Sequence, residues 1–190
     1  MKQSGKFSAN GYRSLVTRFL DANYHFCDFS QKNFNEPNVI FRHDVDFSTK
    51  AARDLARLEA DLGIVSTYFF LLRSPFYNIW NPRTLGHIEE VRSLGHKIGL
   101  HFDASLYNQD IDCINHAANN ECEIMQKIIG DHVDVISFHR PVKFLHGLDQ
   151  KIAGREHAYS KKFFEDFGYV SDSRGAWCFG SPDKHKAFIG

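Results

Sequence analysis

The 190-residue sequence has no excess of charge of either sign, no long apolar run and no paired cysteine motif. Its 23 basic and 23 acidic residues give a formal net charge of zero, so composition offers no electrostatic reason to expect nucleic acid as a partner. No segment approaches the ~20 apolar residues of a membrane-spanning helix, and residues 1–10 hold no apolar signal-peptide core. We therefore expect a cytoplasmic protein without membrane insertion.

Cysteine usage and sequence complexity exclude further classes. Cys27, Cys113, Cys122 and Cys178 form no CxxC pair, which argues against a zinc finger or a disulfide scaffold, and we expect reduced, mostly buried thiols. Repeats, linkers and low-complexity tracts are missing as well. With 43% hydrophobic and 24% charged residues, ordinary globular usage, residues 1–190 are expected to form a single folded domain.

Strand-like and helix-like apolar patterns alternate along the chain. Strands are predicted at residues 24–29, 39–46, 65–72, 96–103, 134–141 and 169–173, and helices at 9–22, 49–62, 83–95 and 107–129, with a mixed segment at 149–167. Strands that alternate with helices are typically parallel and joined by right-handed crossovers. The pattern therefore predicts an α/β fold, either a doubly wound sheet or a barrel.

The segment Phe41-Arg-His-Asp-Val-Asp46 ends one of these strands with two carboxylates. Alternate side chains of a strand share a face, so Arg42, Asp44 and Asp46 should point the same way. Two neighbouring ionised carboxylates raise the pKa of one or both unless a cation lies between them, so the array requires a metal, a proton or an arginine. The alternative is that both are loop acids, one of them capping the helix that starts near Ser48.

Polar residues also stand at the C-terminal ends of later predicted strands: His101, Asp103, His139, Arg140 and Asp172. In parallel α/β folds this edge carries the active site. Asp46, His101 and Asp103 together offer one nitrogen and two oxygen donors, a set that suits Zn²⁺ or a similar divalent metal. Such a site requires the carboxylate oxygens of Asp44 and Asp46 to lie within about 8 Å of the His101 ring, because zinc bonds are only ~2.0–2.2 Å long.

Five short motifs resemble those of the polysaccharide deacetylase (NodB-homology) family, in a divergent bacterial branch associated with surface polysaccharide. The motifs are residues 41–46, 66–70, 95–101, 137–141 and 171–175, and the resemblance spans about residues 39–185. It implies a distorted (β/α) barrel of about seven parallel strands. It also implies metal-dependent removal of an N-acyl group, acetyl or formyl, from an amino sugar or polysaccharide precursor.

The resemblance implies roles for single residues. Asp44 matches the catalytic base, which accepts a proton from the attacking water beside a divalent metal, most readily zinc. His101 matches the first histidine of the family's His-x-x-x-His metal motif. Arg140 matches the arginine that orients the base, and Asp172 matches a later aspartate, which we expect at the substrate.

The sequence departs from the family pattern at two metal-binding positions. Val45 stands where the family has its metal-binding acid, so Asp46 must take that role if a similar geometry is kept. Ser105 stands where the second histidine ligand belongs, which leaves Asp103 as the replacement.

The family's last motif, a strand that ends in Leu-x-His and supplies the general acid, is not found before Gly190. His139 is then our candidate to protonate the leaving amine, and one alternative is a truncated form whose barrel lacks its last strand. Phe76, Tyr77 and Trp80 follow a strand at the same edge and are expected to stack on a sugar. A second functional alternative remains, a catalytically impaired or non-catalytic carbohydrate-binding or regulatory domain of the same fold.

Overall fold

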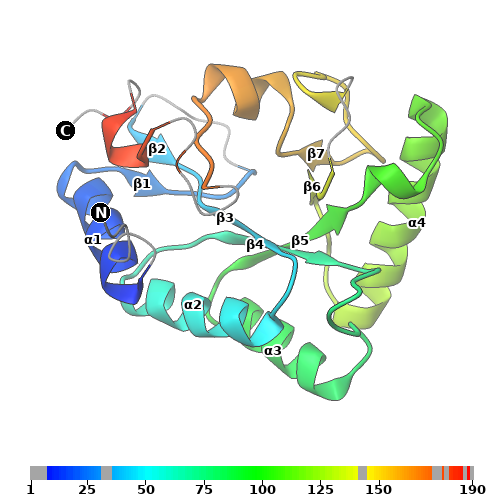
Figure 1. Cartoon of the computed structure of the whole chain (residues 1–190), viewed down its shortest axis with the longest axis horizontal. Helices are drawn as coiled ribbons and strands as arrows, with labels where there is room; N and C mark the ends of the chain where they lie inside the picture. The colour runs from blue at the N-terminus through cyan, green and yellow to red at the C-terminus, as the bar shows by residue number, and fades with distance from the viewer. Residues whose placement is uncertain are drawn as a thin grey trace.

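A five-stranded parallel sheet forms the centre of the computed structural model, which describes residues 8–30, 36–140, 145–172, 177, 180–185 and 188 (Figure 1). Its strand order is β3-β4-β5-β6-β7, formed by Arg42–Val45, Thr67–Leu71, Lys97–Phe102, Val135–Phe138 and Glu156–His157. A separate parallel pair joins β1 (His25–Phe26) to β2 (Asn38–Val39).

Four longer helices surround the sheet: α1 (Ala9–Asp21), α2 (Thr49–Asp61), α3 (Pro82–Ser93) and α4 (Ile111–Ile129). Figure 1 shows α2 and α3 below the sheet and α4 to its right. Short helical turns occur at η1 (Ala104–Leu106), η3 (Lys162–Asp166) and η5 (Pro182–Lys184). The last of these lies beside α1, where the ring of Phe188 is 4.9 Å from that of Phe19.

Capping residues in the sequence determine where the helices begin and end. The side chain of Ser48 accepts a hydrogen bond from the Ala51 N–H, which confirms it as the N-cap of α2 directly after β3. Asn81 caps α3 in the same way, with Pro82 at the first helical position. At the end of α4, Gly130 adopts a left-handed φ of 65°, a conformation that glycine adopts without strain.

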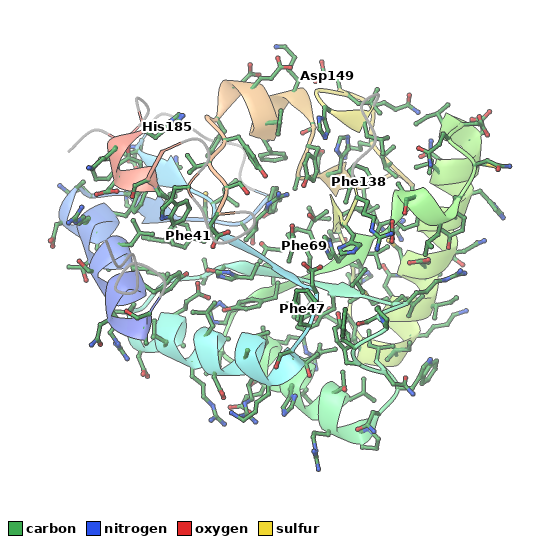
Figure 2. All side chains as sticks on the ribbon, viewed as in Figure 1. Phe41, Phe47, Phe69, Phe138, Asp149 and His185 are labelled. Carbon is green, nitrogen blue, oxygen red and sulfur yellow. The ribbon has the colours of Figure 1, made fainter. Side chains whose placement is uncertain are left out.

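The core lies on both faces of β4, whose five residues are all buried. This confirms the doubly buried strand that the apolar and aromatic residues at 65–72 predict. Phe69 is fully buried near the centre of the molecule, where Figure 2 labels it. A Cβ on Gly99 of β5 would lie 2.5 Å from a ring carbon of Phe69, so glycine at this position leaves room for the buried Phe69 ring.

The α/β class with parallel strands is confirmed, but the sheet is not a closed barrel within the described ranges, since β3 and β7 are its edges. The predicted strand at 24–29 shortens to two residues, and residues 169–172 form no strand. Residue 173 and part of the motif at 171–175 lie outside the described residues. Among the described cysteines, Cys122 is buried and Cys27 partly buried, whereas Cys113 is exposed and so contradicts the expectation for that thiol.

No helix in the described part of the chain combines the length and apolar character needed to cross a bilayer.

A buried carboxylate ties β3 to the helices behind it. Glu59 of α2 is fully buried and accepts hydrogen bonds from the hydroxyls of Tyr12, Ser66 (2.9 Å) and Tyr68 (2.5 Å), and it lies 2.7 Å from Nε2 of His43. Burial alone would raise the pKa of Glu59, but the charge of His43 and these hydrogen bonds outweigh it and lower the pKa to about 2. Glu59 therefore stays ionised in the core.

Replacing Glu59 by Gln is expected to lower the free energy of unfolding by about 3 kcal/mol at pH 7, because it leaves the surrounding donors without their charged acceptor. The pKa is about 2 in the folded chain and rises to its ordinary value of 4.5 on unfolding. The advantage of the wild type should thus be complete above pH 4.5 and disappear as the pH falls towards 2.

Urea denaturation at a series of pH values measures this difference. The control is Glu89→Gln, at an exposed position of α3, which should change stability by less than about 0.5 kcal/mol. Equal stability of Glu59→Gln and wild type at pH 7 would contradict the buried ionised network.

Candidate functional site

The register of the sheet brings the carboxyl ends of its strands to one level. Val45 of β3 pairs with Phe70 of β4, which in turn pairs with Leu100 of β5. Asp46, which directly follows β3, and His101 of β5 therefore stand at the same level on either side of β4. Because parallel strands end at one edge, both side chains face the same space.

Asp46, His101 and His139 converge there, each offering an oxygen or nitrogen within 4.8 Å of the other two. Oδ1 of Asp46 lies 3.2 Å from Nε2 of His101 and 2.9 Å from Nδ1 of His139. The two imidazole nitrogens are 3.2 Å apart. His139 follows β6 directly and is held by its own N–H, which donates to the Phe102 carbonyl at 2.9 Å.

The cluster fits a divalent cation on the chemistry of its donors. Nδ1 of His101 lies 3.2 Å from the Ser137 carbonyl, which can only accept, so in the neutral ring Nδ1 carries the proton and Nε2 presents its lone pair. Oδ1 of Asp46 is buried and receives no hydrogen bond of regular geometry from the described residues. Two imidazoles and one carboxylate are a donor set that zinc accepts while keeping an open position.

Electrostatics keep Asp46 ionised. Burial alone would raise the pKa of Asp46, but the neighbouring imidazoles of His101 and His139 outweigh it and lower the pKa. The carboxylate thus remains available as a ligand.

Asp44, two residues before Asp46, faces a partly buried arginine. Arg42 donates to the hydroxyls of Ser137 (3.3 Å), Tyr159 (3.2 Å) and Tyr169 (3.2 Å), and its guanidinium lies 4.8 Å from the Tyr159 ring centroid. Its Nη2 is 3.8 Å from Oδ2 of Asp44. The guanidinium of Arg42 therefore lies within ion-pair distance of the Asp44 carboxylate.

The other carboxylate oxygen of Asp44 is buried and has no hydrogen-bond partner among the described residues. It lies 4.0 Å from Nδ1 of His101. Asp44, Asp46, His101 and His139 all line one cavity of about 960 Å³, together with Asp172. The distance condition set by the sequence, about 8 Å between both carboxylates and His101, is met.

Asp103, which we expected as a metal ligand, and Arg140, which we expected to orient the catalytic base, both lie outside this cluster. Asp103 comes after β5 has ended, and its Oδ1 accepts from the N–H (3.1 Å) and hydroxyl (2.6 Å) of Ser105 at the start of η1. Arg140 is mostly exposed, and its Nε lies 3.8 Å from Oδ2 of Asp103. The structure thus places Arg42, and not Arg140, beside Asp44.

The expected sugar-stacking residues divide into two kinds. Phe76 and Trp80 are exposed on the loop after β4. Tyr77 instead accepts a hydrogen bond from the Leu71 N–H and donates one to the Val45 carbonyl, both at 2.8 Å, so its hydroxyl ties the ends of β3 and β4 together.

Sequence reasoning put Arg42 on the face of Asp44 without pairing the two, and it put His139 at this edge as a proton donor and not as a member of the possible metal-binding group. The signal for Arg42 was present, because its alternation with Asp44 and Asp46 puts all three side chains on one face. Tyr159 and Tyr169, which hold Arg42, come from segments without regular periodicity and carried no such signal.

No family model and no curated protein matches the sequence. Among solved structures, the deacetylase PplD of Streptococcus pyogenes in complex with acetate matches with a TM-score of 0.54 at 11% identity, over 72% of this chain and 67% of that one. IcaB from Ammonifex degensii matches with a TM-score of 0.51 at 11% identity, over 69% of this chain and 66% of that one. The chain thus spans about two thirds of the length of each. These likenesses show the fold alone, which is the polysaccharide deacetylase (NodB-like) fold that the sequence motifs predict.

The contact between His101 and the Ser137 carbonyl predicts which tautomer the neutral ring adopts. Long-range ¹H–¹⁵N NMR correlations on metal-free protein should show the proton on Nδ1 of His101 and the lone pair on Nε2. The exposed imidazole of His132 serves as a reference ring within the same spectrum. A proton resident on Nε2 of His101 would remove the lone pair from the cluster and contradict its donor chemistry.

Proposed function

We propose that this chain is a divalent-metal-dependent hydrolase that removes an N-acyl group, acetyl or formyl, from an amino sugar or polysaccharide precursor. The observation that carries the proposal is the meeting of Asp46, His101 and His139 beside Asp44 at the carboxyl edge of a parallel sheet. The deacetylase-like fold agrees with this reaction class.

In this proposal Asp46, His101 and His139 hold the metal, with zinc first among candidates because two of three donors are imidazoles. A bound zinc ion supplies Lewis acidity towards the acyl carbonyl and lowers the pKa of water. His139 thus takes the ligand position for which the sequence offered Asp103, and it is no longer free to act as the proton donor.

Asp44 is the proposed general base, and Arg42 orients it. The attacking water gives a proton to the carboxylate of Asp44 while its oxygen bonds to the acyl carbon. When the carbon–nitrogen bond breaks, the same proton can pass from Asp44 to the leaving amine, so one carboxyl serves both steps. The products are a free amino sugar and acetate or formate.

The cavity that holds these groups is large enough for one sugar ring. At about 960 Å³ it lies at the upper end of the ~300–1,000 Å³ usual for small-molecule sites. We propose that Asp172, which lines it, accepts hydrogen bonds from sugar hydroxyls.

One zinc ion is expected to bind per chain, measured by calorimetric titration and elemental analysis. Asp46→Asn and His139→Gln should each weaken binding by more than the roughly 10–100-fold that loss of an outer-shell partner causes. Asp103→Asn should keep wild-type stoichiometry, because that carboxylate is engaged by Ser105. Loss of zinc in Asp103→Asn with retention in His139→Gln would reverse the assignment.

Acetate and formate release from N-acyl amino sugars tests the catalytic role of Asp44. Asp44→Asn should lower kcat by roughly 10²–10⁴-fold while zinc still binds one to one, since the variant removes the proton acceptor and leaves the three ligands. The matched control is Asp134→Asn, an exposed acid before the start of β6. A wild-type protein that binds zinc yet releases neither acid would favour the non-catalytic carbohydrate-binding alternative.

A further inference from the structure

The hydroxyl of Tyr77 bonds both partners of the last step in the hydrogen-bond ladder between β3 and β4. Near the start of this ladder the N–H of Thr67 donates to the Phe41 carbonyl at 2.9 Å. Because the bonds of a parallel pair repeat every two residues along each strand, the N–H of Leu71 and the Val45 carbonyl are equivalent partners four residues further on. The Tyr77 hydroxyl accepts from that N–H and donates to that carbonyl, both at 2.8 Å. These two hydrogen bonds form the Tyr77 clamp, which holds the carboxyl ends of the two strands together.

The clamp is built from a side chain that is itself held in place. The Tyr77 N–H donates to the Ser74 hydroxyl at 3.3 Å, and the aromatic ring is partly buried against the core. Burial, together with the negative charge of Asp46, raises the pKa of Tyr77, although the hydrogen bond from the Leu71 N–H lowers it. The hydroxyl therefore keeps the proton that it donates to the end of β3.

The clamp acts on the peptide group that carries Asp46. Val45 is the last residue of β3, and its carbonyl belongs to the same planar peptide group as the N–H of Asp46. A fixed Val45 carbonyl therefore limits how the backbone of Asp46 can turn. Asp46 is followed by Phe47, which Figure 2 labels, and by Ser48, whose side chain caps α2. Asp46 thus stands between two anchored points, the Tyr77 clamp and the start of α2.

Tyr77 reaches the candidate site through Asp46 and not through the cavity. The described residues that line the cavity of about 960 Å³ include Asp46 but not Tyr77. A carboxylate whose backbone is already held in place loses little conformational freedom when it binds a metal, which raises affinity. Loss of the clamp should therefore be measurable at the metal.

We propose that Tyr77 is a positioning residue for the metal site, whose hydroxyl holds the peptide before Asp46 so that the Asp46 carboxylate faces the two imidazoles in the metal-free chain. This role differs from the contact with sugar that the sequence predicts for Tyr77, because it acts on a ligand of the metal and not on the substrate. The inference rests on the proposed function, since that function makes Asp46 a metal ligand.

Tyr77→Phe tests the clamp, because it keeps the ring and removes only the hydroxyl. Calorimetric titration of the metal-free chain with zinc should show wild-type stoichiometry and a Kd about 10–100-fold higher, the loss that follows removal of an outer-shell partner. The visible absorption bands of the cobalt-substituted variant should also change, because they report the geometry of the ligands around the metal.

Tyr107→Phe is the matched control, since it removes another tyrosine hydroxyl, one that donates to Glu121 at 2.6 Å. It should keep wild-type zinc affinity and cobalt bands. Circular dichroism and thermal melting establish that both variants are folded. A lower melting temperature of Tyr77→Phe with unchanged zinc affinity and cobalt bands would reduce the clamp to a structural contact and overturn the proposal.

A second measurement uses the wild-type chain and so does not depend on the folding of Tyr77→Phe. Linkage is reciprocal: if the clamp strengthens zinc binding, zinc must strengthen the clamp by the same factor. Hydrogen exchange of the Leu71 amide, which the clamp protects, should therefore slow by about 10–100-fold on zinc saturation, beyond any slowing at the amide of Val16, a buried residue of α1. Equal slowing at the two amides would overturn the proposal.

The outcome separates this inference from the function on which it rests. Zinc binding that is equally tight in wild type and Tyr77→Phe would leave the hydrolase standing and remove the positioning role. Zinc binding that Tyr77→Phe weakens, in a wild type that releases neither acetate nor formate, would keep the positioning role and remove the hydrolase. Absence of zinc binding by the wild type would remove both.

Discussion

The parallel hydrogen-bonded register of β3, β4, β5 and β6 is the constraint on which the whole site depends. It sets Asp46 and His101 at one level across β4, and it puts His139 one residue beyond the end of β6. A slip of one residue in β3 would turn Asp46 and Asp44 to the other face of the sheet. The site is therefore only as well ordered as the core that fixes this register, with the buried β4 at its centre.

Because side chains alternate along β3, the two faces of the strand have different roles. On one face, Arg42, Asp44 and Asp46 meet the cavity, where each acid has a cation or an imidazole beside it. On the other face, His43 meets the buried Glu59 and joins β3 to α2. Asp44, Asp46 and Glu59 thus each lie within ion-pair distance of an arginine or a histidine, which is the condition for holding several carboxylates close together in a folded core.

Much of the fold could be predicted from periodicity, because α2, α3, α4 and the central strands carry strong apolar patterns and clear caps. The meeting of Asp44, Asp46 and His101 followed from strand ends alone. Asp103 does not join His101 as predicted, since β5 ends at Phe102 and the Asp103 side chain instead caps η1. Arg42 was on the predicted face, but its tyrosine cage depends on tertiary packing of residues 145–172, where the sequence has no regular period. The closed barrel was not found for a related reason: Tyr169 contacts Arg42, but residues 169–172 form no strand.

The central proposal is that one carboxylate and two imidazoles, from Asp46, His101 and His139 at three strand ends, bind a single divalent ion. Anomalous diffraction from crystals of the zinc-soaked protein, recorded on both sides of the zinc absorption edge, tests it most directly. The account predicts one peak at ~2.0–2.2 Å from Asp46 Oδ1, His101 Nε2 and His139 Nδ1. A zinc peak bound through Asp103, or no peak within reach of His101, would contradict it.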